Sequence, residues 1–153
     1  MKLLIYFFSL ITLACSSGRS LKKTNTLNKL CTSETTFIYQ AHSRGFFEEI
    51  SINEKTVVFL KNRKRIKPFK GLVSLKDWKI CINLLNSIDL SKISQFTAPS
   101  NLRKTDRVPY AQLIVIKNGD TIKSNYFDHK NPPQELKQLV NRILSIKENN
   151  ISI

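Results

Sequence analysis

The chain is poor in the residues from which most catalytic and metal sites are built. Among its 153 residues there are four glycines and two histidines, His42 and His129. So few glycines argue against a catalytic cleft lined by bare backbone. The sequence has no Gly-x-Ser-x-Gly elbow, no phosphate-binding glycine loop, no His-Glu-x-x-His helix and no closely spaced set of zinc ligands. Glu48 and Glu49 are adjacent in an expected strand, so their side chains point to opposite faces and cannot form an acid–base pair. We expect a protein that is not an enzyme and that holds no cofactor and no metal.

Long hydrophobic runs are also scarce. The one such run extends from Leu3 to Ala14, directly after Lys2, and it is too short to span a bilayer as a helix. A charged start, a short apolar segment and a small residue before a cleavage point describe a secretory signal. We therefore expect residues 1–14 to be a signal peptide.

The junction between Ala14 and Cys15 resembles a bacterial lipobox, the site where a diacylglycerol is attached to cysteine and the leader is removed. The usual motif has Leu three residues before the cysteine, whereas this chain has Thr12 there. The resemblance implies lipid attachment at Cys15. The following residues, up to residue 33, are rich in Ser, Thr, Asn and Lys, so residues 15–33 are expected to form a flexible tether.

Acidic residues are outnumbered, 11 against 25 Lys and Arg, which gives a formal net charge of +14. In a cytosolic protein this excess would suggest nucleic acid. For an exported protein the available polyanions are anionic lipid, lipopolysaccharide and other envelope polymers. We expect a membrane or envelope partner, with no nucleic acid.

The positive charge is densest between residues 61 and 70. The basic residues of this segment are Lys61, Arg63, Lys64, Arg65, Lys67 and Lys70. One interpretation is an anion-binding loop, because each basic side chain near an anionic membrane gains roughly 1 kcal/mol. The alternative is a solvated loop after an edge strand, where lysines discourage aggregation between strands.

Three cysteines are an odd number for an oxidising compartment. If Cys15 carries lipid, Cys31 and Cys81 are left as a possible disulfide, worth roughly 4 kcal/mol on a chain-entropy estimate. The alternative is that Cys81 is a small buried side chain on a helix and Cys31 is a free thiol.

The hydrophobic pattern predicts strands and helices in alternating groups. Strands are expected at residues 36–40, 46–52, 56–60, 110–116 and 121–127, with helices after residue 74 and from about residue 134. Ser74 with Asp77 is a helix N-cap signal, and Asn118–Gly119 suits a type I′ hairpin turn.

These elements predict an α+β fold, in which an antiparallel sheet of four to five strands carries two helices on one face, in the order β-ββ-α-ββ-α. Residues 61–70 are expected to be a polar loop. The single domain is expected to span residues 34–148, with a disordered tail at 149–153.

Four polar residues lie at expected strand ends and could meet in the fold. His42, Arg44, Asp128 and His129 form one possible polar cluster. The alternative is that each is a loop residue that hydrogen-bonds nearby backbone.

Two further segments contribute to a resemblance that extends over the whole chain. These are Ser43-Arg44-Gly45-Phe46-Phe47-Glu48-Glu49-Ile50 and Phe127-Asp128-His129-Lys130-Asn131-Pro132-Pro133. With the lipobox-like start and the low-Gly composition, the chain resembles small uncharacterised lipoproteins of Bacteroidota-type bacteria. The resemblance implies an envelope lipoprotein of one α+β domain and carries no activity. Because Cys15 is not followed by an acidic stretch, we expect the protein at the outer membrane, facing the periplasm.

Three functional hypotheses follow. The first is a non-catalytic, lipid-anchored binding or accessory domain that presents a basic loop to an anionic envelope partner. The second is an inhibitor or immunity-type protein that blocks an enzyme through residues 61–70 or 98–107. The third is a small envelope enzyme that uses the region of His42, Asp128 and His129.

The lipid anchor gives the first testable prediction. A Cys15→Ala variant should accumulate as an unprocessed or soluble protein, because it lacks the acceptor for the acyl chains. Fractionation of membrane and soluble material measures this, and unchanged membrane partitioning of the variant would falsify the lipoprotein hypothesis.

Overall fold

The computed structural model describes residues 34–151, and the expectations for residues 1–33 lie outside this range. The signal peptide, the lipid site at Cys15, the tether and Cys31 are therefore not tested by the structure.

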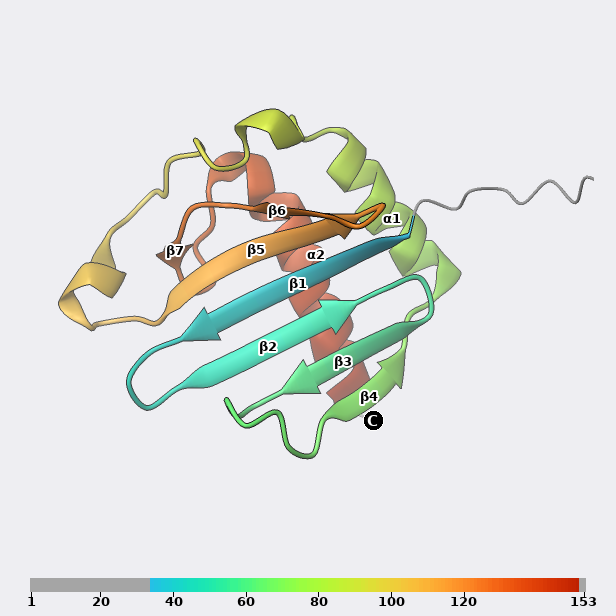
Figure 1. The fold of residues 1–153 in the computed structure, drawn as a ribbon, viewed down its shortest axis with the longest axis horizontal. Coiled ribbons are helices and arrows are strands. Elements are labelled where there is room, and N and C mark those ends of the chain that lie inside the picture. The colour runs from blue at the N-terminus through green and yellow to red at the C-terminus, as the bar shows by residue number, and fades with distance from the viewer. Residues whose placement is uncertain (1–33, 152–153) are drawn as a thin grey trace, which may run out of the picture. The chain divides into compact units, whose positions relative to one another are not determined.

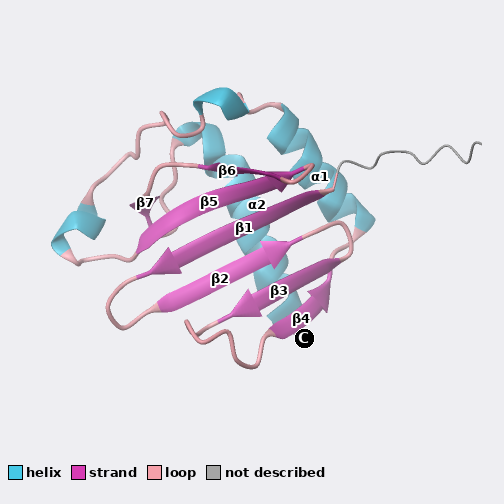
Figure 2. Ribbon diagram, in the orientation of Figure 1, coloured by secondary structure: helices cyan, strands magenta, loops and turns pink. Residues whose placement is uncertain are grey.

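The described residues form a sheet of seven strands and two α-helices (Figures 1 and 2). The strands are β1 (Thr35–His42), β2 (Phe47–Ile52), β3 (Thr56–Leu60), β4 (Phe69–Leu72), β5 (Tyr110–Lys117), β6 (Asp120–Lys123) and β7 (Phe127–Asp128). The helices are α1 (Leu75–Asn86) and α2 (Gln134–Ile151), with two short 3₁₀ turns, η1 (Leu90–Lys92) and η2 (Leu102–Thr105), between α1 and β5.

All strand pairs are antiparallel, in the order β4-β3-β2-β1-β5-β6, and β7 also pairs with β5. The first four strands are a meander. Strand β5 then returns to the free side of β1, where Phe37 faces Val115 and Tyr39 faces Leu113. The long β1–β5 pairing joins the two halves of the chain.

The predicted α+β class and antiparallel sheet are confirmed, but the prediction of four to five strands was too low. Strand β4 lies at the end of the segment that we expected to be a polar loop, and its residues are mostly exposed, so it has no hydrophobic alternation to reveal it. The expected strand at 121–127 is two strands, β6 and β7, and a two-residue strand such as β7 has no period to detect.

Both helices lie behind the sheet in Figure 1, and the side chains between the layers form the core. Strand β1 alternates between buried and half-buried residues along its whole length, with Phe37, Tyr39 and Ala41 buried. These side chains pack with the apolar stripe of α2, which includes Leu136, Val140 and Ile143.

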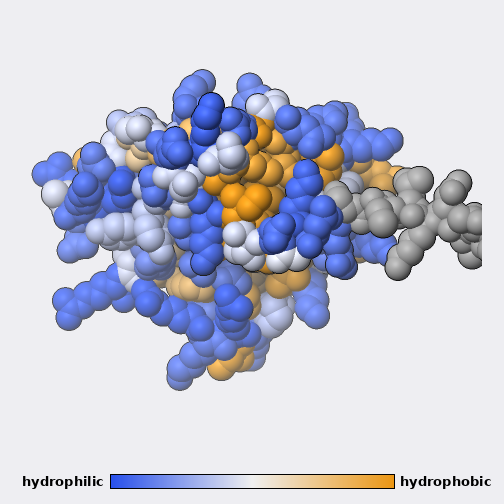
Figure 3. Space-filling model, turned by 45° about the horizontal axis from the view of Figure 1, so that its top comes forward, coloured by the Kyte–Doolittle hydropathy of each residue, from blue (hydrophilic) through white to orange (hydrophobic). Residues whose placement is uncertain are grey.

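The other face of the sheet carries no helix of residues 34–151. Ile38 and Ile114 face each other across β1 and β5 on this side and are half-buried. Figure 3, which views the molecule from the front and above, shows a continuous hydrophobic area surrounded by hydrophilic side chains.

The predicted local signals are confirmed at two places. Ser74 caps α1 by accepting a hydrogen bond from the Asp77 N–H at 3.0 Å, and its hydroxyl donates back to the Asp77 carboxylate. Asn118 and Gly119 have φ values of 55° and 91°, the positive values that a type I′ turn requires.

Helix α2 is longer than expected. It continues to Ile151, so residues 149–151, which we expected to belong to a disordered tail, are helical. The extension brings the last turn of α2 beside β4. A Cβ added at Gly71 would clash with the Asn150 side chain, so glycine allows this close approach.

Cys81 is a free cysteine, fully buried in the core on α1, while its predicted partner Cys31 lies outside the described residues. Burial raises the pKa of the Cys81 thiol to about 11. The disulfide stays a prediction.

The state of Cys81 can be measured directly. Because the reactive species is the thiolate, a buried thiol with a raised pKa should resist alkylation at neutral pH in the folded protein and react once the protein is unfolded in urea. Mass spectrometry of the modified peptide detects this. If Cys81 is bridged to Cys31 instead, it will become alkylated in urea only after a reductant is added.

Candidate ligand-binding groove

A groove runs between the end of α2 and the loops at the β4 side of the sheet. It consists of two adjoining cavities of about 540 and 400 Å³, which share Phe59, Lys61 and Ile151 as lining residues. We call the first the inner cavity and the second the outer cavity.

The outer cavity combines apolar and basic side chains. Its apolar part includes Ile66, Phe69 and Ile151, which are 55%, 41% and 42% exposed. Lysines from the β3–β4 loop surround it: Lys61, Lys64 and Lys67. An apolar surface with ammonium groups at its margin suits a molecule that has both a hydrocarbon part and an anionic part.

The β3–β4 loop holds its shape through its own side chains. The Asn62 carboxamide accepts a hydrogen bond from the Ile66 N–H at 3.0 Å and donates one to the Ile66 carbonyl at 2.8 Å. Arg65 and Lys67 both adopt left-handed backbone conformations, with φ of 55° and 56°, which L-residues rarely take without such support. The loop is therefore built by specific contacts.

The structure divides the predicted basic residues into two groups. The two arginines fasten the loop to its neighbours: Arg63 donates to the Ser43 carbonyl at 2.8 Å, and Arg65 pairs with the buried Glu49 at 2.7 Å. The lysines at 64 and 67 have no ion-pair partner among the described residues. The sixth basic residue, Lys70, belongs to β4 and not to the loop.

The inner cavity contains a buried ion pair that sequence reasoning missed. Lys147 on α2 donates to Glu48 on β2 at 3.3 Å, although the two residues lie 99 positions apart. Lys147 Nζ also lies 5.0 Å from the centre of the Phe59 ring, and Lys61 Nζ lies 5.5 Å from the same ring. Glu48 is 8% exposed, and its second oxygen, Oε1, has no hydrogen-bond partner among the described residues.

One signal in the sequence could have revealed this pair. Glu48 occupies the same strand face as Ile50 and Ile52, and Lys147 lies four residues after Ile143 on the apolar stripe of the last helix. Opposite charges on two surfaces that must pack together indicate a buried contact.

The predicted polar cluster does not form. His42 lies on the face of β1 away from the helices, where its ring stacks against Tyr110 at 6.1 Å and also contacts Tyr126. Arg44 is exposed in the β1–β2 turn. Asp128 and His129 are neighbours at the end of β7 but have different partners, because consecutive side chains in an extended chain point in opposite directions.

His129 lies next to the inner cavity. The Tyr39 hydroxyl and His129 Nδ1 are 2.9 Å apart, and the ring of Phe46, which lines the inner cavity, is 5.4 Å from the imidazole. The Tyr39 oxygen also accepts from the Lys130 N–H. Burial lowers the pKa of His129, and the charge of Glu48 opposes this effect.

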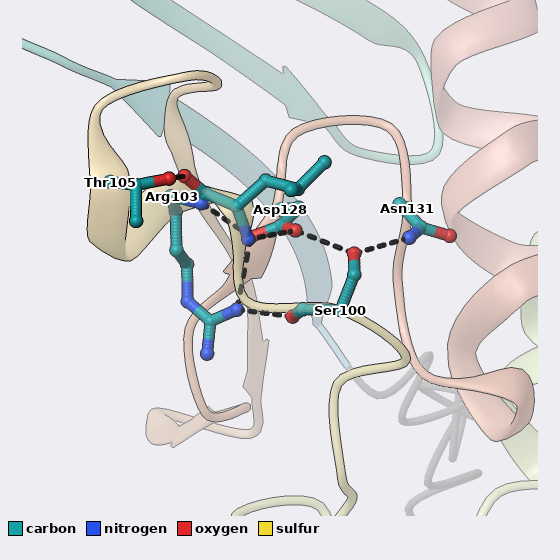
Figure 4. A network of polar contacts seen from close by, with 6 residues as sticks. Ser100, Arg103, Thr105, Asp128 and Asn131 are labelled. Carbon is teal, nitrogen blue, oxygen red and sulfur yellow. Dashed lines mark hydrogen bonds and ion pairs between the residues drawn. The ribbon is translucent and has the colours of Figure 1, made fainter.

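Asp128 is the centre of a buried network that holds the loop before β5 (Figure 4). The Ser100 hydroxyl, the Leu102 N–H, the Arg103 N–H and the Arg103 guanidinium all donate to its carboxylate, at 2.5 to 3.0 Å. Burial would raise the pKa of Asp128, but the hydrogen bonds from Ser100 and Arg103 outweigh it and lower the pKa to about 2. Both carboxylate oxygens of Asp128 accept hydrogen bonds, so the network holds Ser100, Leu102 and Arg103 in place. We call this network the Asp128 clamp.

Within residues 34–151 there is no group of three or more His, Cys, Asp or Glu side chains placed to hold a metal ion. The same residues include no helix with the length and hydrophobicity needed to cross a membrane. No protein-family model matches the sequence, and no curated protein matches it significantly.

The clamp at Asp128 gives a stability prediction. Asp128→Asn should lower the free energy of unfolding by about 3 kcal/mol, because it leaves the buried Arg103 without its counter-charge. Urea denaturation followed by circular dichroism measures the difference.

The pH dependence provides the control for this prediction. Since the folded-state pKa is depressed, the stabilisation is present above the ordinary Asp pKa of 3.8 and is lost as the pH falls through about 2. The difference between the variant and the wild-type protein should shrink over that interval. A difference that stays constant down to the lowest pH would contradict the clamp.

Proposed function

We propose that this protein is a non-catalytic binding protein, held at a bacterial envelope membrane by lipid on Cys15, whose groove binds an amphiphile with an anionic headgroup. The observation that carries the proposal is the outer cavity, where three lysines surround exposed aromatic and aliphatic side chains. The basic loop is expected to bind an anionic partner, and the apolar side chains of the outer cavity suit a hydrocarbon chain. Both features favour an amphiphilic ligand.

The charge supports an anionic group at the rim. The lysines at positions 61, 64 and 67 are exposed, and the arginines of the loop are already engaged with Ser43 and Glu49. Lys64 and Lys67 have no ion-pair partner within residues 34–151, so their ammonium groups are available to a phosphate or carboxylate, which they would bind through charge-assisted hydrogen bonds.

The floor supports an apolar part in the ligand. Ile66, Phe69 and Ile151 leave apolar surface open to water in one place, and each methylene of an acyl chain that covers it would gain about 0.8 kcal/mol. A purely polar polyanion would leave this surface uncovered. A lipid is therefore favoured over a soluble envelope polymer.

The anchor and the groove would act together. A lipid at Cys15 would keep the domain at the membrane from which the ligand comes, which raises the effective concentration of the ligand at the groove. The anchor needs no affinity of its own for that ligand.

A second candidate is an inhibitor that blocks a partner enzyme with residues 98–107. The observation that favours it is the Asp128 clamp, which holds Ser100, Leu102 and Arg103 in one conformation. A preorganised loop loses little conformational entropy on binding. A tight, stoichiometric complex with one envelope enzyme, abolished by substitutions in this loop, would favour this candidate.

The binding proposal is tested with dihexanoyl-phosphatidylglycerol, a monomeric anionic lipid, titrated into the full chain carrying Cys15→Ala. Lys64→Glu with Lys67→Glu should weaken binding at least about tenfold, since two favourable charges become unfavourable. Binding should also fall with added salt. Calorimetry or NMR titration measures both effects.

Two controls accompany this experiment. Lys123→Glu with Lys137→Glu makes the same change in net charge at exposed positions on β6, at the opposite edge of the sheet, and on the first turns of α2, so it should bind like the parent. Glycerol phosphate, which lacks acyl chains, should bind far more weakly. Equal weakening by both double variants would mean that overall charge alone attracts the lipid.

A further inference from the structure

We infer that a separate pocket, where β5 begins, binds an acidic saccharide, with Arg103 donating hydrogen bonds to it and Tyr126 packing against a sugar ring. This site goes beyond the proposed function, because it shares no lining residue with the inner or the outer cavity. The pocket has a volume of about 440 Å³, a size typical of small-molecule sites. We call it the tyrosine pocket, after Tyr110 and Tyr126 in its lining.

The first support is an aromatic wall that is open to solvent. Tyr126 is 44% exposed, and its ring is perpendicular to that of Tyr110, with the ring centres 6.0 Å apart. His42 contacts both rings, so the three side chains support one another. A sugar ring has an apolar face of C–H groups, which can pack on an aromatic ring and cover it from water.

The second support is a set of hydrogen-bond donors on Arg103 that the fold leaves unused. The residue is 8% exposed, and only one nitrogen of its guanidinium, Nη1, makes hydrogen bonds, to Ser100 and Asp128 (Figure 4). The Nε and Nη2 atoms have no partner within residues 34–151, and neither is sealed from solvent. Because Arg103 lines the tyrosine pocket, these N–H groups can donate to a ligand there. The Asp128 clamp already fixes the guanidinium, so little conformational entropy is lost on binding.

The third support is a group of exposed amide side chains in the lining. Gln95, Asn101 and Asn125 line the pocket, and their side-chain amides make no hydrogen bond within the described part of the chain. Asn101 precedes η2 without capping it through its side chain. An amide both donates and accepts, as a sugar hydroxyl does, so this lining suits a saccharide better than a hydrocarbon chain.

The charge of the pocket favours a carboxylate on the sugar. No acidic residue of the described chain lines it, and Lys104 is exposed without an ion-pair partner among residues 34–151. The charge of Arg103 is balanced by Asp128, so Lys104 gives the site a net positive charge. A carboxylate can compensate this charge, and it also accepts hydrogen bonds from a guanidinium.

The test uses acidic saccharides from two envelope sources, titrated into the full chain carrying Cys15→Ala and followed by NMR. One probe is a disaccharide of 3-deoxy-octulosonic acid, the acidic sugar of the lipopolysaccharide core. The other is trigalacturonate, a uronic acid of the kind found in extracellular polysaccharides. At least one probe should bind, and the one with the higher affinity identifies the source.

Two chemical controls accompany these probes. The methyl ester of the bound saccharide should bind about tenfold more weakly, because it lacks the negative charge. Tricarballylate, which has carboxylates but no sugar ring, should not displace the saccharide. Binding of neither saccharide, equal affinity for acid and ester, or displacement by an equal concentration of tricarballylate would overturn the inference.

Substitutions assign the binding to the tyrosine pocket. Tyr126→Ala should weaken binding at least about tenfold, whereas Tyr126→Phe, which keeps the ring, should stay within about threefold of the parent. Asn101→Ala should also weaken binding. The matched control is Asn141→Ala, which removes an exposed amide on α2 outside the pocket and should bind like the parent. Unchanged affinity in folded Tyr126→Ala would overturn the inference.

Arg103 is tested without substitution, because its removal would break the Asp128 clamp. In ¹⁵N-labelled protein the Nε–H resonance of Arg103 should shift as the saccharide binds, whereas that of Arg142, which pairs with Asp77, should not. An unmoved Arg103 resonance at saturation would exclude it as the donor and overturn the inference. Dihexanoyl-phosphatidylglycerol should bind equally well to the saccharide-saturated protein, and competition between the two ligands would contradict a separate site.

Discussion

The pairing of β1 with β5 is the constraint on which the rest of the structure depends. It joins residues 35–42 to residues 110–117 and so connects the meander of β2, β3 and β4 to the second half of the chain. Helix α2 follows β7 and packs across β1, β2 and β3 toward β4. The groove exists because this crossing ends beside the β3–β4 loop, where Lys147 pairs with Glu48 and where Ile151 and Phe59 line both cavities.

What the sequence predicted well was local. The Ser74 cap and the Asn118–Gly119 turn depend on residues within a few positions of each other, and the α+β class follows from the order of such elements. Strand β4 and the Glu48–Lys147 pair depend on contacts between distant segments. The predicted cluster of His42 and Asp128 failed for the same reason: Tyr110 of β5 pairs with both residues and separates them, and their positions at expected strand ends do not reveal this pairing.

The basic segment shows how charge density can mislead when it is counted without geometry. Its arginines and its lysines have different surroundings. Arg63 and Arg65 make contacts within the domain. Lys64 and Lys67 line the outer cavity. The planar guanidinium suits fixed bidentate contacts, whereas the lysine ammonium is a point charge on a flexible stem. Both original interpretations of the segment, anion binding and solvated loop, treated these six side chains as one group.

The two walls of the groove differ in how they are held. Arg63 joins the β3–β4 loop to the β1–β2 turn and Asn62 makes two hydrogen bonds within the loop, so side-chain hydrogen bonds hold this wall in place. The facing wall is the terminal turn of α2, and helix ends open at low free-energy cost. Because Ile151 lies on this last turn, fraying of the helix end would change the shape of the groove more readily than a movement of the loop.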